Sequence, residues 1–438
     1  MKETATGPYV DVKDLKLGMY VHLELGWMAH PFPLSSFRLT GLEQIDTIRT
    51  LGLQRLRWSP EKSAGDVVAA HLPGASERLG QASLPPAEGL AEVSGIETAE
   101  AVARRQRKRA LTAQREAQRQ CESQLGEASR EFKRALEMVA TVPQQARLQT
   151  EALAGTLLKK MTGDGDMAIR LIGENAGDKA SMHALNVTVI SLLMGRVFGL
   201  AEEDLLDLGV GALLHDVGKL DLPDRVRFRD DHFTAAEVQF YQEHVAHGVS
   251  AGRKMGLAPG ALLVIAQHHE HTDGTGFPMR LNSDRMSMAA RIVALVNRYD
   301  NLCNPGLPSK ALTPHESLSL LFAQGKNKYD TAIMGAFIKM MGVYPPGSAV
   351  QLTDDRYALV TSVNSSRPLK PRVLVHDPRV PRDEALLLDL EKSPALGIRR
   401  SVKPLQLPRE ALDYLSPRPR VVYFFEPARE LEPTEIAA

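Results

Sequence analysis

The sequence has few cysteines, no excess charge of either sign and no long uninterrupted apolar run. Its two cysteines among 438 residues, Cys121 and Cys303, lie far apart and form no Cys-x-x-Cys pair. This spacing excludes a cysteine-rich zinc module and favours a reducing compartment. The 53 basic and 53 acidic residues balance, so the whole chain has no net attraction for nucleic acid or for an anionic membrane.

A membrane-spanning segment is not expected from the sequence either. The longest apolar stretch of the middle part, Val187 to Leu200, is interrupted by Ser191, Gly195 and Arg196 and is too short to cross a bilayer. The first residues lack the apolar core of a signal peptide. We therefore expect a cytoplasmic protein whose partners include neither membranes nor nucleic acids.

Length and periodicity divide the chain into predicted parts, since 438 residues exceed one ordinary core. Residues 1–58 alternate like strands around one helical stretch and predict a small α+β domain. Residues 59–97 have the composition of a linker, and residues 98–142 predict a highly charged helix. Residues 150–345 predict a helical domain, and residues 346–438 predict a β-rich appendix. The expected fold class is mainly α, with a small α+β domain before the helices and strands after them.

The charged helix carries a basic run from Arg104 to Arg109. A solvated helix face is the simpler interpretation, because few aromatic residues are interleaved for stacking on bases. Contact with an acidic partner is the alternative interpretation. The length of this helix also leaves open a homodimer formed through it.

Histidines gather in the middle of the chain. Eight of the thirteen lie between His183 and His271. Neutral imidazole is the commonest metal-ligating side chain, so this clustering predicts a metal centre. His268 and His269 end an apolar helical stretch, and adjacent side chains on a helix diverge by about 100°. They would therefore serve two neighbouring ions or lie where the helix unwinds.

Two motifs resemble those of the HD-GYP family. The first is His215-Asp216-Val217-Gly218-Lys219; the second begins with His268-His269-Glu270 and ends with Asp273-Gly274-x-Gly276-Phe277-Pro278. Phe277 stands where the family has the tyrosine of its name. The resemblance covers about residues 155–350 and implies a helical domain that binds two or three iron or manganese ions and hydrolyses cyclic di-GMP. Residues 1–58 resemble the small domain of unknown function that often precedes such domains.

The resemblance also implies a set of metal ligands. It assigns His183, His215 and Asp216 to one ion and His244, His268 and His269 to another. Asp216 is the natural bridge, because a carboxylate offers two oxygens where a histidine has one free donor atom. His247, one turn after His244, does not fit the family's register.

Two positions bear on the number and strength of the metal sites. Some family members bind a third ion through a glutamate one turn before the first histidine, but here that residue is Lys179. We therefore expect two divalent ions. Histidine and carboxylate ligands without thiolate suit iron, manganese or zinc, and the absence of cysteine together with the expected higher coordination favours iron or manganese. The family's aspartate ligand on the helix from Ala289 to Leu302 falls on Asn297. Asp300, one turn later, could replace it as a ligand or act from behind the ligands. An amide oxygen carries no charge and binds hard ions less strongly.

The resemblance assigns Asp216 and Lys219 to catalysis. It also implies that Lys219 contacts the scissile phosphate. The other positions expected to contact substrate are Gly276, Phe277, Pro278 and Lys310. The basic pair that clamps phosphate in the family falls on Gly306 and Ser309, with Lys310 one residue out of register. Asp273 is expected in the second shell, where it would orient either the glycine loop or a ligand histidine.

These features predict a cyclic di-GMP phosphodiesterase that produces pGpG or GMP. A second hypothesis is a weakened receptor or scaffold that binds the nucleotide or a GGDEF-type cyclase, which the residues at Asn297, Gly306 and Ser309 favour. A third is an HD phosphohydrolase that acts on another nucleotide.

Overall fold

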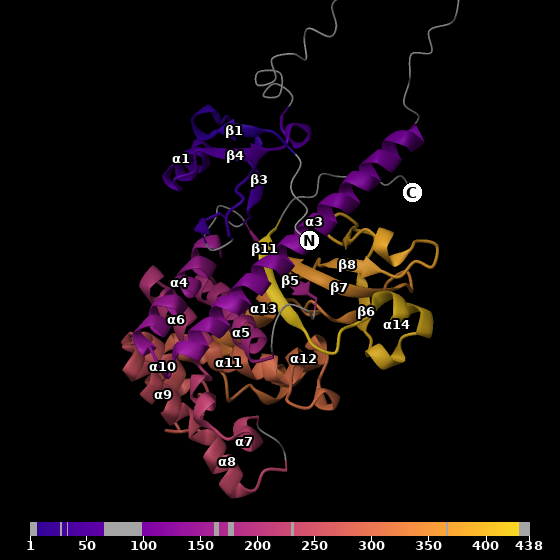
Figure 1. The fold of residues 1–438 in the computed structure, drawn as a ribbon. Coiled ribbons are helices and arrows are strands. Elements are labelled where there is room, and N and C mark those ends of the chain that lie inside the picture. Colours follow the sequence, from indigo (N-terminus) through magenta and orange to yellow (C-terminus); the bar gives the residue numbers. More distant parts are fainter. Residues whose placement is uncertain are drawn as a thin grey trace, which may run out of the picture. The chain divides into compact units, whose positions relative to one another are not determined.

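The computed structural model describes residues 7–26, 29–32, 34–64, 99–161, 166–173, 179–228, 232–364 and 367–428 (Figure 1). The chain forms two compact units, residues 1–105 and residues 106–438. Most of the predicted linker, from residue 65 onward, lies outside the described residues.

The first unit is a small α+β domain, as predicted. Its four antiparallel strands follow the order β1-β4-β2-β3 and are β1 (Tyr9–Asp11), β2 (Tyr20–His22), β3 (Ser36–Arg38) and β4 (Arg55–Trp58). Helix α1 (Leu42–Thr50) and the short 3-10 turns η1 (Val12–Asp14) and η3 (Pro60–Lys62) complete it. Trp58, Met19 and Ile48 are buried together in the core between the sheet and α1.

The charged helix is present as α3 (Ala99–Met138) and is followed by α4 (Pro143–Met161). Pro143 begins the second helix at a position where its missing N–H costs nothing. The basic run on α3 is exposed, whereas Leu125 and Phe132 further along are buried. The helix is therefore solvated at its beginning and part of the core of the second unit near its end.

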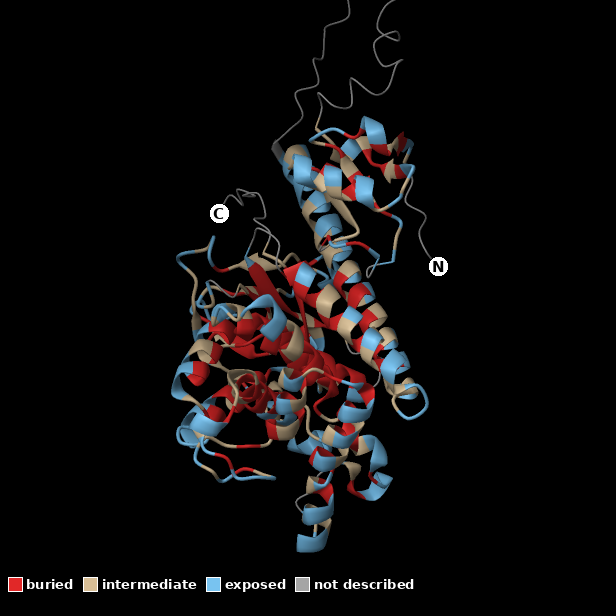
Figure 2. Ribbon diagram, turned by 90° about the vertical axis from the view of Figure 1, so that its left-hand side faces the viewer, coloured by how far each residue is buried: buried red, intermediate tan, exposed pale blue. Residues whose placement is uncertain are grey.

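A bundle of helices forms the middle of the second unit, and its central helices are buried on almost every side (Figure 2). The helices are α5 (Lys179–Val197), α6 (Glu202–Leu214), α7 (Asp224–Arg227), α8 (Ala235–Gln242), α9 (His244–Met255), α10 (Pro259–Gln267), α11 (Met288–Cys303), α12 (Pro314–Gln324) and α13 (Thr331–Met341), with the 3-10 turns η6 (Val217–Asp221), η7 (Ser283–Arg285) and η8 (Pro308–Lys310). Helix α5 packs against α6 and α11, and α6 packs against α10. Capping boxes at Thr234 and Thr313 begin α8 and α12.

One described helix is long and apolar enough to cross a membrane by composition alone. It is the stretch Ala180–Val197 of α5, and 78% of it is buried inside the fold. Its apolar residues pack against neighbouring helices, which is the ordinary role of a core helix in a bundle.

The second sheet contains seven antiparallel strands, with the order β10-β6-β7-β5-β11 and with β8 paired to β7 and to β9. The strands are β5 (Met167–Ile172), β6 (Ala349–Leu352), β7 (Tyr357–Asn364), β8 (Arg372–Val375), β9 (Leu388–Asp389), β10 (Ile398–Ser401) and β11 (Val422–Pro427). Helix α14 (Arg409–Leu415) and the turns η9 (Arg382–Glu384) and η10 (Pro404–Gln406) lie between the last strands.

Strand β5 is an exception within residues 150–345, the part of the chain predicted as a helical domain. It precedes the helical bundle in sequence, yet it pairs with β7 and β11 of the C-terminal part. Met167–Ile172 is short and, apart from Arg170, apolar. Such a stretch cannot be distinguished from a helical segment by periodicity. The sheet after residue 346 is therefore built around a strand from the helical part, and the predicted boundary at residues 345–346 remains a sequence prediction.

Candidate metal centre

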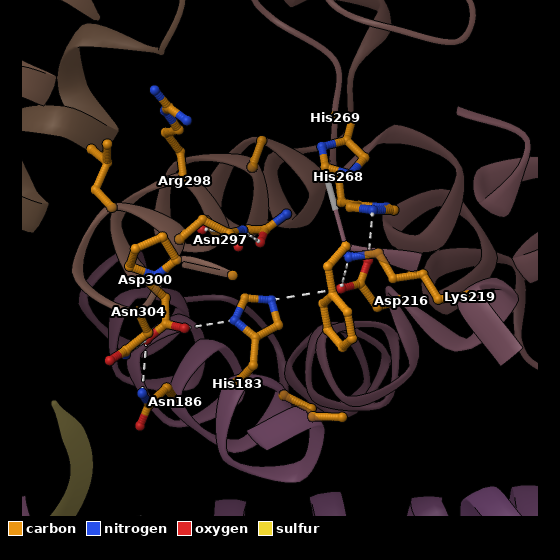
Figure 3. A pocket seen from close by; sticks show the side chains of 18 of the residues that line it. His183, Asn186, Asp216, Lys219, His268, His269, Asn297, Arg298, Asp300 and Asn304 are labelled. Carbon is orange, nitrogen blue, oxygen red and sulfur yellow. Dashed lines mark hydrogen bonds and ion pairs between the residues drawn. The ribbon is translucent and has the colours of Figure 1, made fainter. Parts of the chain in front are cut away.

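The six histidine and aspartate side chains expected as ligands meet in the second unit. Figure 3 shows His183, Asp216, His268 and His269 among them. One group contains His183, His215 and Asp216, and the other contains Asp216, His244, His268 and His269; within each group the ligand atoms lie within 4.8 Å of one another. Asp216 belongs to both groups, as the resemblance implied. His247 lies outside them, 40% exposed and beside Asp221.

Helix ends deliver five of these six side chains. Helix α6 ends at Leu214, so His215 and Asp216 lie in the turn before η6. His244 is the first residue of α9. Helix α10 ends at Gln267, directly before His268 and His269, whose ring centroids are 4.1 Å apart. Of the two alternatives for this adjacent pair, the structure shows that the helix unwinds there.

Gly218 lets the turn that carries Asp216 approach α9. A Cβ atom at this position would lie 1.9 Å from the carbonyl oxygen of His244 and 2.3 Å from the backbone nitrogen of Gly248. No side chain fits at those distances. Glycine is therefore required for the close approach that brings Asp216 to His244.

Backbone carbonyls select the tautomer of three of the histidines. In each, Nδ1 lies at hydrogen-bonding distance from the carbonyl oxygen three residues earlier, which pairs His215 with Ala212, His244 with Tyr241, and His268 with Ile265. A carbonyl oxygen only accepts, so Nδ1 carries the proton and Nε2 turns a lone pair toward the cluster. These are the atoms that a metal ion requires.

The separations between these nitrogens fit a shared cation. Nε2 of His183 lies 3.1 Å from Nε2 of His215, and Nε2 of His244 lies 3.4 Å from Nε2 of His268. Two facing lone pairs repel each other unless a cation lies between them. Metal–imidazole bonds of about 2.0–2.1 Å would separate two such ligands by about 2.8–3.4 Å, depending on the angle between them.

The carboxylate of Asp216 faces both groups. Oδ2 lies 3.5 Å from Nε2 of His215 and 3.7 Å from that of His183, and Oδ1 lies 3.6 Å from Nε2 of His244 and 3.7 Å from that of His268. Oδ1 is buried and receives no hydrogen bond within the described part of the chain. Burial opposes its charge, but the positive charge of Lys219 holds the pKa of Asp216 well below its usual value. A buried anionic oxygen without a donor is suited to a cation.

Burial keeps three of the histidines neutral. It lowers the pKa of His215 and of His269 well below the ordinary imidazole value, and that of His244 to about 3. Nε2 of His269 is buried and has no hydrogen-bond partner among the described residues. Neutral rings with free Nε2 atoms around one carboxylate can hold divalent cations. The side chain of Lys179 lies outside the described residues, so its effect on a third ion stays a prediction.

Asp300 contacts the cluster from behind His183. Its Oδ2 lies 2.6 Å from Nδ1 of His183, and its side chain is fully buried. Nδ1 of His183 therefore donates to this carboxylate and leaves Nε2 for the cluster. Asp300 is not one of the grouped ligand atoms. Its contact orients the ring of His183, and its role as a replacement for the missing aspartate ligand stays a prediction.

Asn297 remains the candidate for the family's aspartate position. It is buried on α11 and lines the same cavity as His183 and His268 (Figure 3). Its Oδ1 accepts a hydrogen bond of 2.6 Å from Nδ2 of Asn301. A carbonyl oxygen has a second lone pair, so this contact leaves one position for a cation.

Lys219 pairs with Asp216. Its Nζ lies 2.6 Å from Oδ2 of Asp216 and 5.3 Å from the ring centroid of Tyr241. Burial opposes the ammonium charge, but the carboxylate outweighs burial and holds the pKa of Lys219 above its ordinary value. The lysine is thus a fixed positive charge at the edge of the cluster.

Glu270 and Asp273 contact different parts of the glycine loop. The fully buried carboxylate of Glu270 accepts hydrogen bonds from the backbone of Met279 at 2.6 Å and of Leu281 at 2.9 Å. Asp273 is exposed, and its Oδ1 accepts bonds from the backbone and hydroxyl of Thr275. These contacts support the first of the two roles expected for Asp273, that of shaping the loop, while the role of orienting a ligand histidine stays a prediction.

Of the three loop residues expected to contact substrate, Gly276, Phe277 and Pro278, only Phe277 lines the cavity. Its ring stacks on His269 with centroids 4.5 Å apart and an angle of 23° between the planes. Gly276 is buried against the backbone, where a Cβ would lie 2.4 Å from Cα of Glu270. Pro278 is exposed and is not among the lining residues. The ring thus contacts the site while Gly276 permits the tight backbone path.

The cluster opens into a cavity of about 1180 Å³. Its wall carries basic side chains from several elements: Lys219, Arg227, Arg298, Lys310, Lys328 and Arg420. Large apolar side chains line other parts of it, namely Leu220, Phe228, Tyr241, Phe277 and Leu307. A cavity of this size with convergent cations suits an anionic organic ligand.

Family comparisons agree with this geometry. Residues 175–333 match the model of the HD domain, and residues 9–152 match that of a domain of unknown function, DUF3391. The central part of the chain is an HD domain. The resemblance drawn from the two motifs and from the small preceding domain is thus confirmed. The DUF3391 match extends beyond residue 58, through α3 and into α4.

Curated relatives are similar to parts of this chain. A cyclic di-GMP phosphodiesterase of Pseudomonas aeruginosa is 28% identical over 197 residues, which are 44% of this chain and 47% of that protein. A cyclic di-GMP phosphodiesterase response regulator of Xanthomonas campestris is 30% identical over 150 residues, 34% of this chain and 39% of its own. A 3′3′-cGAMP-specific phosphodiesterase of Vibrio cholerae is 33% identical over 122 residues, 27% and 23% of the two chains. The chain spans less than half the length of each of these relatives.

Several residues of the HD domain site were not found from the sequence. Glu270 lies inside the second motif. Its role could have been inferred because a carboxylate there precedes a loop whose backbone N–H groups need acceptors. Arg298 and Lys328 line the cavity but come from separate elements with no shared motif. Asn186 and Asn304 reach the centre only through Asp300.

Proposed function

We propose that this chain is a metal-dependent phosphodiesterase that hydrolyses cyclic di-GMP to pGpG or GMP. The observation that carries the proposal is the pair of ligand groups that share Asp216 at the wall of a cavity lined by cations. The names of two relatives support cyclic di-GMP as the substrate. A third relative, specific for 3′3′-cGAMP, makes that related dinucleotide the competing substrate.

The residues present would hold two divalent ions, one between His183, His215 and Asp216 and one between Asp216 and the three remaining histidines, His244, His268 and His269. Bound there, such ions would supply a Lewis acid for a phosphodiester and a nucleophilic water at neutral pH. We infer iron or manganese, because imidazole and carboxylate ligands without thiolate suit these metals. Asn297 is the further oxygen ligand that the proposal assigns.

Lys219 would contact the phosphate as a charge. Its raised pKa means that Nζ keeps its proton at neutral pH. It therefore serves as a cation for a non-bridging phosphate oxygen rather than as a proton donor to the leaving oxygen. The contact gains strength as negative charge develops in the transition state.

The rest of the cavity would bind the dinucleotide. Arg298, Lys310 and Lys328 line the wall and supply cations for the phosphates. They replace the family's basic pair, whose positions are occupied here by Gly306 and Ser309. Phe277 offers an apolar ring beside the ligands, stacked on His269. The ring excludes water from that side of the cluster, while the tyrosine hydroxyl of the family is missing.

A second candidate is a receptor that binds the nucleotide with little or no hydrolysis, or a scaffold for a GGDEF-type cyclase. One observation favours it: Asn297 offers a neutral oxygen that already accepts a bond from Asn301. A weaker metal site would retain nucleotide binding and lose turnover. Another nucleotide as the substrate of an HD phosphohydrolase remains the third alternative.

The experiment is an assay on full-length protein purified without oxygen and supplied with manganese or iron. Cyclic di-GMP and 3′3′-cGAMP are incubated separately, and the products are separated by chromatography. The control is the double variant His215→Ala and Asp216→Ala, which removes the centre of both ligand groups. Hydrolysis of cyclic di-GMP by wild type alone supports the proposal. Tight binding without hydrolysis favours the receptor, and neither binding nor hydrolysis contradicts both.

A further inference from the structure

The carboxylate of Asp300 joins the candidate metal centre to the C-terminal strand. Oδ2 accepts from Nδ1 of His183 at 2.6 Å. Oδ1 accepts from Nδ2 of Asn186 at 2.7 Å and from Nδ2 of Asn304 at 2.9 Å. Both oxygens are therefore occupied, and the group is fully buried. These contacts fix its orientation and with it the ring of His183.

The same two asparagines hold the backbone at the start of β11. The carbonyl oxygen of Val421 accepts from Nδ2 of Asn186 at 3.0 Å and from Nδ2 of Asn304 at 2.8 Å. The N–H of Val421 donates to Oδ1 of Asn304, and the N–H of Tyr423 donates to Oδ1 of Asn186. Each amide thus binds Asp300 and the strand at once, so one contact orients the other.

Strand β11 is itself fixed by other elements. It pairs with β5 from Val422 to Pro427, and Glu426 forms a buried ion pair of 2.6 Å with Arg170. The hydroxyl of Tyr423 lies 3.0 Å from that of Tyr299 on α11 and donates to the carbonyl of Pro346. The strand is therefore an anchored support rather than a loose tail beside the helices.

We propose that the C-terminal strand positions a metal ligand: Val421 and Tyr423, acting through Asn186 and Asn304, hold Asp300 against His183. The inference rests on the proposed function, because it concerns the metal site of that activity. It assigns the C-terminal sheet a part in the centre that the HD domain alone would lack. Asn186, Asn304 and Asp300 are positioning residues, since none of them belongs to the grouped ligand atoms.

The proposal predicts an effect on one ligand group. His183 belongs with His215 and Asp216, whereas His244 and His268 are oriented by carbonyls three residues earlier in the chain, and His269 stacks on Phe277. A disturbance at Asn304 should therefore weaken the ion held by the first group and spare the ion of the second. A general loss of stability would weaken both.

The test uses full-length Asn304→Asp and Asn304→Ala. The aspartate replaces a donor by an oxygen that faces Oδ1 of Asp300 and the carbonyl of Val421. The alanine is milder, because Asn186 continues to donate to both acceptors. The control is Gln351→Ala, which removes an amide that bonds Arg400 and Asp355 in the same sheet, on β6. Melting temperatures in chelator check that each variant is folded.

Manganese titration followed by electron paramagnetic resonance measures the two affinities, and His183→Ala identifies the affinity that belongs to the first group. We expect Asn304→Asp to weaken that same affinity by about tenfold to a hundredfold, Asn304→Ala to weaken it less, and Gln351→Ala to leave both unchanged. Unchanged affinities in both Asn304 variants, or an equal loss at both sites, would overturn the inference. Absence of manganese binding in wild type would instead contradict the proposed function.

Discussion

Nζ of Lys219 lies 2.6 Å from Oδ2 of Asp216, the oxygen that also faces His183 and His215. The lysine thus contacts the oxygen that faces the group of His183 and His215. Oδ1 remains for the group that contains His244 and His268. This arrangement places a permanent cation beside the proposed metal site without using a ligand atom of a histidine.

Replacing Lys219 by methionine tests its role as a phosphate contact. Loss of the charge removes a transition-state interaction, so kcat for cyclic di-GMP should fall by about a hundredfold or more. The ligand atoms remain, so the metal content should stay at the wild-type value. Lys219→Arg keeps a cation and should retain more activity. An unchanged kcat in Lys219→Met would show that this lysine only neutralises Asp216.

Asn297→Asp should strengthen metal binding. The new carboxylate can keep the bond that Asn301 now donates to Oδ1 and adds a negative charge beside the cluster. We expect the manganese affinity of the site that Asn297 serves to rise by roughly tenfold, because charged oxygens bind hard cations more tightly. Equilibrium titration of both proteins measures this. An unchanged affinity would mean that α11 supplies no ligand.

The buried pair Arg170 and Glu426 should contribute to stability. Its side chains are only 7% and 8% exposed, so Glu426→Ala leaves an arginine without its charge partner. Breaking such a pair costs about 3–5 kcal/mol. Urea unfolding at neutral pH measures the loss. Asp413→Ala, which breaks an exposed pair with Arg409, is the control and should leave the free energy of unfolding close to that of wild type.

The metal-free protein should lose stability as the pH falls below about 6.5, the ordinary pKa of histidine. Burial keeps His215, His244 and His269 neutral in the fold, with the pKa of His244 at about 3. Between these values the unfolded chain binds more protons, so acid favours unfolding. Urea unfolding in chelator at pH 7.5, 6.5 and 5.5 should give a decreasing free energy. A constant or rising value would contradict the buried neutral rings.

The cluster of five histidines and Asp216 could be predicted from the sequence, because each residue belongs to a local motif or is a histidine in register with one. The supporting contacts could not. Asn186 and Asp300 are 114 residues apart, and Asn304 and Val421 are 117 apart. On the C-terminal strand, Asn186 and Asn304 contact backbone atoms, which carry no residue-specific signal. Only the packing of β11 against α5 and α11 brings these groups together.

The same limit explains the differences in the fold. Helices with capping boxes, such as those that begin after Thr234 and Thr313, carry their start signals in four residues. Strand β5 has no such signal, because its partners β7 and β11 come almost two hundred or more residues later. The two roles expected for Asp300, as a ligand or behind one, could not be separated from the sequence, because spacing shows the helix face but not the depth of a side chain.

Anomalous X-ray diffraction from crystals grown with manganese tests the central claim most directly. The account predicts two anomalous peaks beside the carboxylate of Asp216, one near Nε2 of His183 and His215 and one near Nε2 of His244, His268 and His269. About 3.5–4 Å should separate the peaks, the spacing of two-metal sites. A centre with no peak at Asp216, or with manganese bound only elsewhere, would contradict the account.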